Sequence, residues 1–161
     1  GAEVELISMS SRETILRDTM NELRQAYDYI FIDCPPSLGL LTVNALTCSD
    51  SILIPMQCEY YAMEGLSQLL KTIHLLRQNL NTELELEGVI LTMFDSRVNR
   101  SSQIVNEVKK FFGKKTYETI IRRNIRLAEA PSFGKPVILY DKTSKGSQQY
   151  YSLAREFIDR Q

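Results

Sequence analysis

The sequence is poor in cysteine and has no long apolar run. Its three cysteines, Cys34, Cys48 and Cys58, are odd in number and lack the C-x-x-C spacing of zinc and redox sites. We therefore expect a reduced, cytoplasmic setting in which they are packing residues. No apolar stretch approaches the roughly 20 residues that span a bilayer, and the amino end has no signal peptide, so we expect a soluble protein without a membrane partner.

Glycine is also scarce, with 7 residues scattered singly over 161 positions. No G-x-x-x-x-G-K-[ST] sequence occurs, and no lysine lies in a glycine-rich loop after an expected strand. These residues therefore contain no phosphate-binding loop. If the chain contributes to a nucleotide site, we expect it to supply the metal-binding part without the phosphate-binding part, as a fragment would.

The charge is balanced overall but strongly divided along the chain. Residues 1–96 carry 5 basic and 14 acidic side chains, whereas residues 97–145 carry 12 basic and 4 acidic ones. This asymmetry predicts a positive face suited to the phosphates of nucleic acid. The four lysines at positions 109, 110, 114 and 115 have a simpler interpretation, as the solvated side of a helix and its exit. The candidates for contact with phosphate are the arginines in or beside the loops that follow strands: Arg97, Arg100, Arg122, Arg123 and Arg126.

An apolar segment at residues 29–32 is followed directly by Asp33 and then by Pro35 and Pro36. This pattern predicts a buried parallel strand that delivers a carboxylate to its carboxyl end, before a loop stiffened by two prolines. Ligands of open α/β sheets bind at that end of the strands, where an aspartate can order Mg²⁺. The alternative is that Asp33 only caps the next helix.

Hydrophobic periodicity predicts alternating strands and helices along the whole chain. We expect strands at residues 4–8, 29–33, 51–55, 88–93, 117–121 and 137–139, and helices from Ser10 to about 26, at 40–46 and 62–78, from Ser101 onward, and from about 146 to the end. Alternation of this kind predicts an α/β fold with a doubly wound, mostly parallel sheet. The length and the 43% hydrophobic content indicate a single domain over residues 1–161.

Four motifs together resemble the ParA/Soj chromosome-partitioning ATPases, which belong to the MinD/ParA class with a deviant Walker A loop. They are DCPPSLG at 33–39, TVNAL at 42–46, IPMQCEYYA at 54–62 and RLAEAPS at 126–132. The resemblance covers essentially the whole chain, in the family's order and spacing. It implies a P-loop NTPase-like fold truncated at its amino end, namely the carboxyl-terminal two thirds of such an ATPase domain without the P-loop segment.

The resemblance also implies an ATPase that uses ATP and Mg²⁺. Such a protein would bind DNA non-specifically as an ATP-bound homodimer, work with a ParB-type centromere-binding partner, and associate with the nucleoid. Plasmid and chromosome cargo are both compatible with it. A nucleotide-independent DNA-binding or interaction module remains an alternative, as does a MinD-like ATPase. A membrane-binding end like that of MinD is disfavoured, because the basic and acidic residues near the carboxyl end are balanced.

Individual roles follow from the same resemblance. Asp33 would be the Walker B carboxylate, with a catalytic and metal-binding role, and Pro35 and Pro36 the second switch. Asp95 would read the adenine edge, although a turn-capping role before Ser96 is an alternative. Two arginines, Arg97 and Arg126, match positions at which the family contacts DNA, and Arg100 and Arg123 extend that basic group. At position 122 the family usually has proline in a wall of the adenine pocket, so Arg122 either loosens that wall or adds to the positive face.

The missing phosphate loop generates the first prediction. The 161-residue chain alone should show no significant ATP hydrolysis and at best weak nucleotide binding. The backbone N–H groups and the lysine of a P-loop normally supply most of the phosphate recognition. Calorimetry with Mg-ATP measures this directly, and micromolar binding by the chain would contradict it.

Overall fold

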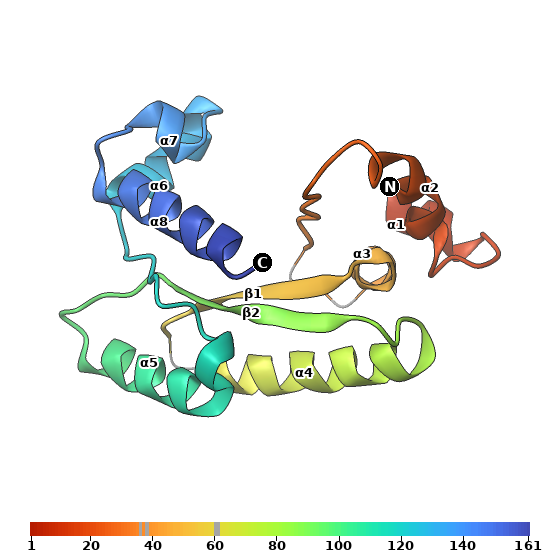
Figure 1. Cartoon of the computed structure of the whole chain (residues 1–161), viewed down its shortest axis with the longest axis horizontal. Helices are drawn as coiled ribbons and strands as arrows, with labels where there is room; N and C mark the ends of the chain where they lie inside the picture. Colours follow the sequence, from red (N-terminus) through yellow and green to blue (C-terminus); the bar gives the residue numbers. More distant parts are fainter. Residues whose placement is uncertain (36, 38, 60–61) are drawn as a thin grey trace. The chain divides into compact units, whose positions relative to one another are not determined.

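The computed structural model describes residues 1–35, 37, 39–59 and 62–161, and its chain divides into two compact units (Figure 1). Unit 1 comprises residues 1–52 and 67–86, and unit 2 comprises residues 53–66 and 87–161. The helices are α1 (Ala2–Ile7), α2 (Ile15–Leu23), α3 (Leu40–Cys48), α4 (Ala62–Asn79), α5 (Asn99–Phe112), α6 (Ile125–Glu129), α7 (Val137–Tyr140) and α8 (Lys145–Asp159). Two 3₁₀ turns, η1 (Gly113–Lys115) and η2 (Ala130–Phe133), and two strands, β1 (Ser51–Gln57) and β2 (Glu85–Thr92), complete the described elements.

The two strands pair in parallel, with α4 as the crossover between them. The Glu85 N–H donates to the Asp50 carbonyl at 3.0 Å where both strands begin, and the Cys58 N–H donates to the Thr92 carbonyl at 2.9 Å where both end. Pro55 lies at an exposed position of β1, and a strand accepts proline where its nitrogen is not required by the ladder. The expected α/β fold with a parallel sheet is confirmed.

In unit 1, the buried side chain of Asn44 on α3 holds the amino end of α2. Its Nδ2 donates to the Arg12 carbonyl at 2.6 Å and to the Leu40 carbonyl at 2.9 Å. Its Oδ1 accepts the Leu16 N–H at 3.1 Å. All of its hydrogen-bonding groups are thus directed at backbone, which is what a buried amide requires.

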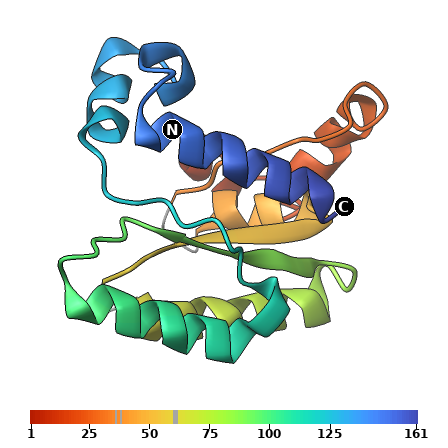
Figure 2. The same ribbon diagram turned by 60° about the vertical axis from the view of Figure 1, so that its left-hand side comes forward.

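Unit 2 is built around the second half of β2, with α5 on one side of that strand and α8 on the other (Figure 2). Ile90 lies in a cluster with Tyr117 and Ile121, against which Leu153 and Phe157 of α8 pack. The neighbouring strand residues Val89 and Leu91 point to the opposite face and are fully buried. Two parallel bridges, Val89 with Thr116 and Phe94 with Arg122, extend the pairing beyond β2.

The amphipathic patterns predicted three of the helices closely, whereas the helix expected from Ser10 to about residue 26 is observed only at 15–23, with Thr14 as its N-cap. The helix expected at 40–46 is observed at 40–48, and the one expected at 62–78 is α4 at 62–79. On α4, Leu66, Ile73 and Leu76 are buried, as the apolar stripe predicts. The last helix begins within one residue of its predicted start.

Four expected strands are wrong or incomplete. Residues 4–8 fall largely in α1, where Glu3 and Glu5 favour the first helical turn. Residues 137–139 form α7, where the Pro136 carbonyl accepts the N–H groups of Leu139 and Tyr140 and closes the helical turn. Residues 29–33 are not assigned to a strand, and residues 117–121 make only bridge pairs. Apolar content indicates what a segment can bury, whereas a strand also requires a neighbour in register.

Ser101 does not begin α5. The helix starts at Asn99, preceded by Val98, and Ser101 lies inside it, where its buried hydroxyl donates to the Cys58 carbonyl at 3.4 Å. A serine near a helix start can satisfy a distant carbonyl as well as a local N–H, and the sequence does not distinguish the two.

The carboxylate of Glu156 fixes the segment before Ile121 to α8. Its two oxygens accept the N–H groups of Glu118 at 2.7 Å and Thr119 at 2.8 Å. Arg160 pairs with Glu156 at 2.6 Å and donates to the Thr116 carbonyl at 3.0 Å, and its guanidinium lies 3.9 Å from the centre of the Tyr117 ring. Burial raises the pKa of Glu156, but the hydrogen bonds from Thr119 and Glu118 and the charge of Arg160 leave that pKa below its usual value.

We therefore expect Glu156→Gln to destabilise the chain at neutral pH. A hydrogen bond to a charged group contributes about 1.5–3 kcal/mol, and glutamine replaces the carboxylate with a neutral acceptor. Because the folded-state pKa is lowered, this stabilisation is present above the unfolded pKa of about 4.3 and is lost as the pH falls through the folded value.

Chemical denaturation between pH 7 and pH 3 measures this effect. The difference in the free energy of unfolding between parent and variant should shrink toward the acid end. Asp159→Asn removes an exposed carboxylate from the same helix and serves as the control. A deficit independent of pH would contradict a role for the charge.

Candidate functional site

Asp33 and Pro35 lie in unit 1, on the segment that leads to α3. Both are exposed, and Pro36 lies outside the described residues. Asp33 does not cap α3, whose N-cap residue is Gly39. The alternative that Asp33 serves only as that cap is therefore wrong.

A carboxylate from α1 occupies the amino end of α3 instead. The Leu40 N–H donates to Oε1 of Glu3 at 3.0 Å. A Cβ atom at Gly39 would collide with the same oxygen, and the flexible Glu3 side chain would have to move aside. The Thr42 hydroxyl donates to the Ser37 carbonyl at 2.6 Å and ties the preceding loop to the helix. No local pattern signals the role of Glu3, which lies 37 residues from Leu40.

Asp95 lies in unit 2, three residues beyond the end of β2, and holds Arg97. Its Oδ1 accepts the Arg97 backbone N–H at 3.0 Å and Nε at 2.9 Å, and its Oδ2 accepts a terminal guanidinium nitrogen at 2.6 Å. The side chain of Asp95 is 18% exposed and that of Arg97 is 84% exposed. The side-chain and backbone hydrogen bonds from Arg97 lower the pKa of Asp95. Asp95 thus caps the turn that follows it, which is the alternative role that the sequence analysis gave for this residue. A contact between Asp95 and adenine stays a prediction.

Two more of the predicted arginines are also paired with carboxylates of unit 2. Arg123 lies 3.2 Å from Glu59. Arg126 lies 2.9 Å from Glu129 and 3.3 Å from Asp141. The spacing of Arg126 and Glu129 on α6 could have suggested their contact. The Glu59 pair joins residues 64 positions apart and has no sequence signal.

Arg122 differs from these arginines in its surroundings. Its guanidinium lies 5.6 Å from the centre of the Phe94 ring, and its backbone N–H donates to Gln149 Oε1 at 3.1 Å. Arg100 is exposed in the first turn of α5. Unit 2 therefore carries all five arginines of the predicted positive face, and the carboxylates next to three of them were not foreseen.

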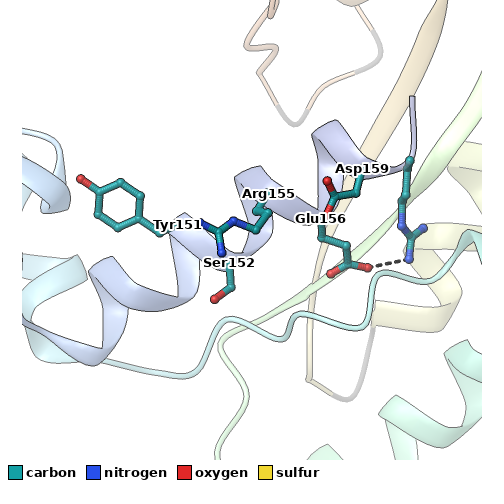
Figure 3. Close-up of a pocket in the computed structure, with 6 residues that line it drawn as sticks. Tyr151, Ser152, Arg155, Glu156 and Asp159 are labelled. Carbon is teal, nitrogen blue, oxygen red and sulfur yellow. Dashed lines mark hydrogen bonds and ion pairs between the residues drawn. The ribbon is translucent and has the colours of Figure 1, made fainter.

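A pocket of about 480 Å³ on α8 is poorly suited to a charged ligand because its charges balance. Arg155 and Arg160 lie there with Glu156 and Asp159, and Figure 3 shows the ion pair that joins Glu156 to Arg160. That pair serves the structural contact with residues 116–119 described above. We assign this pocket no ligand.

The remaining reactive residues show no cluster of metal ligands. Within the described ranges, no group of three His, Cys, Asp or Glu side chains could hold a metal ion. Cys48 and Cys58 are buried, as expected for packing residues, and burial raises the pKa of the Cys58 thiol to about 11. His74 is exposed beside Gln78. No described helix is both long and apolar enough to cross a bilayer.

Comparison with known proteins connects these features to a family. Residues 1–86, more than half of the chain, match a family model described as an AAA domain. The chain belongs to this AAA-domain family. It is 60% identical to the sporulation initiation inhibitor protein Soj of Bacillus subtilis, over 97% of this chain and 62% of Soj. It is 59% identical to the chromosome partitioning protein ParA of Myxococcus xanthus, over 99% of this chain and 56% of ParA.

The predicted relationship to ParA and Soj is thus confirmed for this AAA-domain chain, which spans roughly three fifths of their length. Its fold also resembles that of cobyrinic acid a,c-diamide synthase from Mycobacterium smegmatis, solved with bound ADP and magnesium. That match has a TM-score of 0.75 at 32% identity and covers 96% of this chain and 56% of the synthase.

Proposed function

We propose that the chain is the carboxyl-terminal part of a ParA/Soj-type ATPase that drives the partitioning of chromosomes or plasmids. The observation that carries this proposal is identity of 60% to Soj that extends over 97% of the chain. The similarity to a synthase solved with ADP and magnesium supports ATP and Mg²⁺ as the cofactors of the intact protein.

In the proposed ATPase, Asp33 orders Mg²⁺ and its water ligands at the phosphates, and Pro35 and Pro36 form the switch that follows it. Asp95 accepts a hydrogen bond from the adenine amino group, with the backbone at Arg122 in the same wall of the pocket. Arg97 donates two hydrogen bonds to Oδ1 of Asp95 and one to Oδ2, so Oδ2 keeps an acceptor site for the adenine amino group.

In the same proposal, two protomers close around ATP, bind DNA without sequence preference and respond to a ParB-type partner. Arg97, Arg100, Arg123 and Arg126 supply the DNA contacts. Guanidinium groups suit this role because they are always charged and their planar fork matches a phosphate. The side chains of Arg97, Arg123 and Arg126 are 84%, 55% and 47% exposed, so water and salt screen their ion pairs and phosphate can replace a carboxylate at modest cost.

The test of the ATPase proposal is Asp33→Ala in the intact protein. Turnover should be abolished because the metal loses its carboxylate anchor, while folding is retained because Asp33 is exposed. Phosphate release and circular dichroism measure the two properties. Asp28→Ala, an exposed aspartate earlier in the same segment, is the matched control. Turnover at the parental rate in the Asp33 variant would contradict a metal-binding role for Asp33.

The DNA contacts have a separate test in the ATP-bound protein. Arg97→Ala and Arg126→Ala should each weaken binding equally for unrelated duplexes, since phosphate contacts do not read sequence. Each should flatten the log–log salt dependence by about 0.9 for every phosphate that the variant no longer neutralises, and by about twice that in a dimer.

Titration of two unrelated duplexes at several salt concentrations measures this slope. Arg17→Ala, an exposed arginine on α2 in the acidic half of the chain, is the control. ATP turnover without DNA should stay at the parental rate in the Arg126 variant, whose side chain pairs with Glu129 and Asp141 and not with Asp95. A defect confined to one duplex sequence, or an unchanged slope, would contradict contact with the DNA backbone.

A further inference from the structure

A second surface pocket of unit 2 has an uncompensated positive lining. It has a volume of about 390 Å³ and is lined by Arg122, Lys145, Gln148, Gln149 and Ser152. Two of these residues are cations and the other three are neutral and polar, so the lining contains no carboxylate. Arg122 comes from the segment that bridges to Phe94, and the other four come from the first two turns of α8.

The two cations differ from the other arginines at this end of the unit. Arg97, Arg123 and Arg126 each lie within 3.2 Å of a carboxylate oxygen. Among the described residues, neither Arg122 nor Lys145 has a carboxylate at ion-pair distance. Glu156, one turn beyond Ser152, directs its oxygens at Glu118, Thr119 and Arg160 instead.

The hydrogen bonds around the pocket leave donors available. Gln149 Oε1 accepts the Arg122 backbone N–H at 3.1 Å, which anchors the acceptor end of that amide. The Arg122 guanidinium lies over the Phe94 ring, a contact that leaves the N–H groups at its edge unused. Two cations and an amide N–H₂ group thus border one small volume, which is the chemistry that recognises an oxyanion.

We propose that this pocket is a phosphate-binding site, with Arg122 and Lys145 as the charged contacts and Gln149 as a neutral donor. The phosphate is that of a nucleic-acid backbone, because Arg122, Lys145, Gln148 and Ser152 are all exposed and leave the ligand largely solvated. A free phosphate, by contrast, would gain little in so open a pocket. The assignment of the phosphate to a nucleic-acid backbone rests on the proposed DNA binding. The anion-binding site itself requires no nucleotide.

The experiment compares the 161-residue chain with Arg122→Gln, Lys145→Gln and the double variant, in the absence of ATP. Each single variant should weaken binding of an unrelated DNA duplex and flatten its log–log salt slope. Because both cations share one phosphate, the double variant should reduce the slope by about 0.9, the value for one phosphate, rather than twice that. Lys110→Gln is the matched control, since Lys110 is an exposed lysine of α5, on the other side of β2 from α8.

A second readout probes the site without DNA. Titration with inorganic phosphate, followed by amide nuclear magnetic resonance spectra, should shift the signals of residues 122, 145 and 149 in the parent and not in Arg122→Gln. Phosphate-induced shifts with an unchanged duplex slope would support the anion site and assign it to free phosphate. Unmoved spectra together with an unchanged slope, or an equal slope change in Lys110→Gln, would overturn the proposal. Neither readout depends on ATP turnover, so failure of the ATPase proposal would be seen separately.

Discussion

The pairing of β2 determines where the functional loops of unit 2 begin. Beyond its parallel pairing with β1, the strand receives the Tyr117 N–H at the Val89 carbonyl and the Ile121 N–H at the Leu91 carbonyl, both at 2.9 Å. The side chains of its second half are buried on both faces, with Val89 and Leu91 inaccessible to solvent. The strand cannot shift without exposing apolar surface or breaking these bonds, so the loop that carries Asp95 and Arg97 starts from a fixed point.

Local patterns in the sequence predict elements that need no distant partner. The stripe of α4 specifies a helix because residues three and four apart share a face, whatever the helix packs against. Residues 29–33 show the limit of this reasoning. They have the composition of a buried strand, yet no strand is assigned there and Phe31 is 70% exposed. A ladder is a property of two segments, and a single-sequence pattern describes only one.

The same distinction between local and distant information applies to the candidate site. The division of charge along the chain selected the arginines of unit 2 as candidates, and the resemblance to ParA and Soj selected Asp33 and Asp95; their roles stay predictions. The partners were predictable only where they are close in the sequence, as for Arg126 and Glu129. Glu59 reaches Arg123 from a segment 64 residues away, and Glu3 reaches the start of α3 from α1. Such contacts follow from how helices and strands pack, and neither spacing nor composition records them.

The carboxylate partners of the arginines change how the excess of basic residues at 97–145 should be interpreted. The excess of basic residues at 97–145 favours a positive local potential at this segment, because that potential depends on the sum of the nearby charges and not on individual contacts. Binding of a phosphate at short range depends instead on which cationic side chains have hydrogen-bond donors that no carboxylate already occupies. Where a carboxylate already holds an arginine, a phosphate gains only the difference between two ion pairs. At Arg122 and Lys145 it gains the whole of a new contact. All the basic residues of the segment therefore contribute to the potential, whereas Arg122 and Lys145 offer phosphate a full new contact. Net charge alone does not distinguish these two groups of residues.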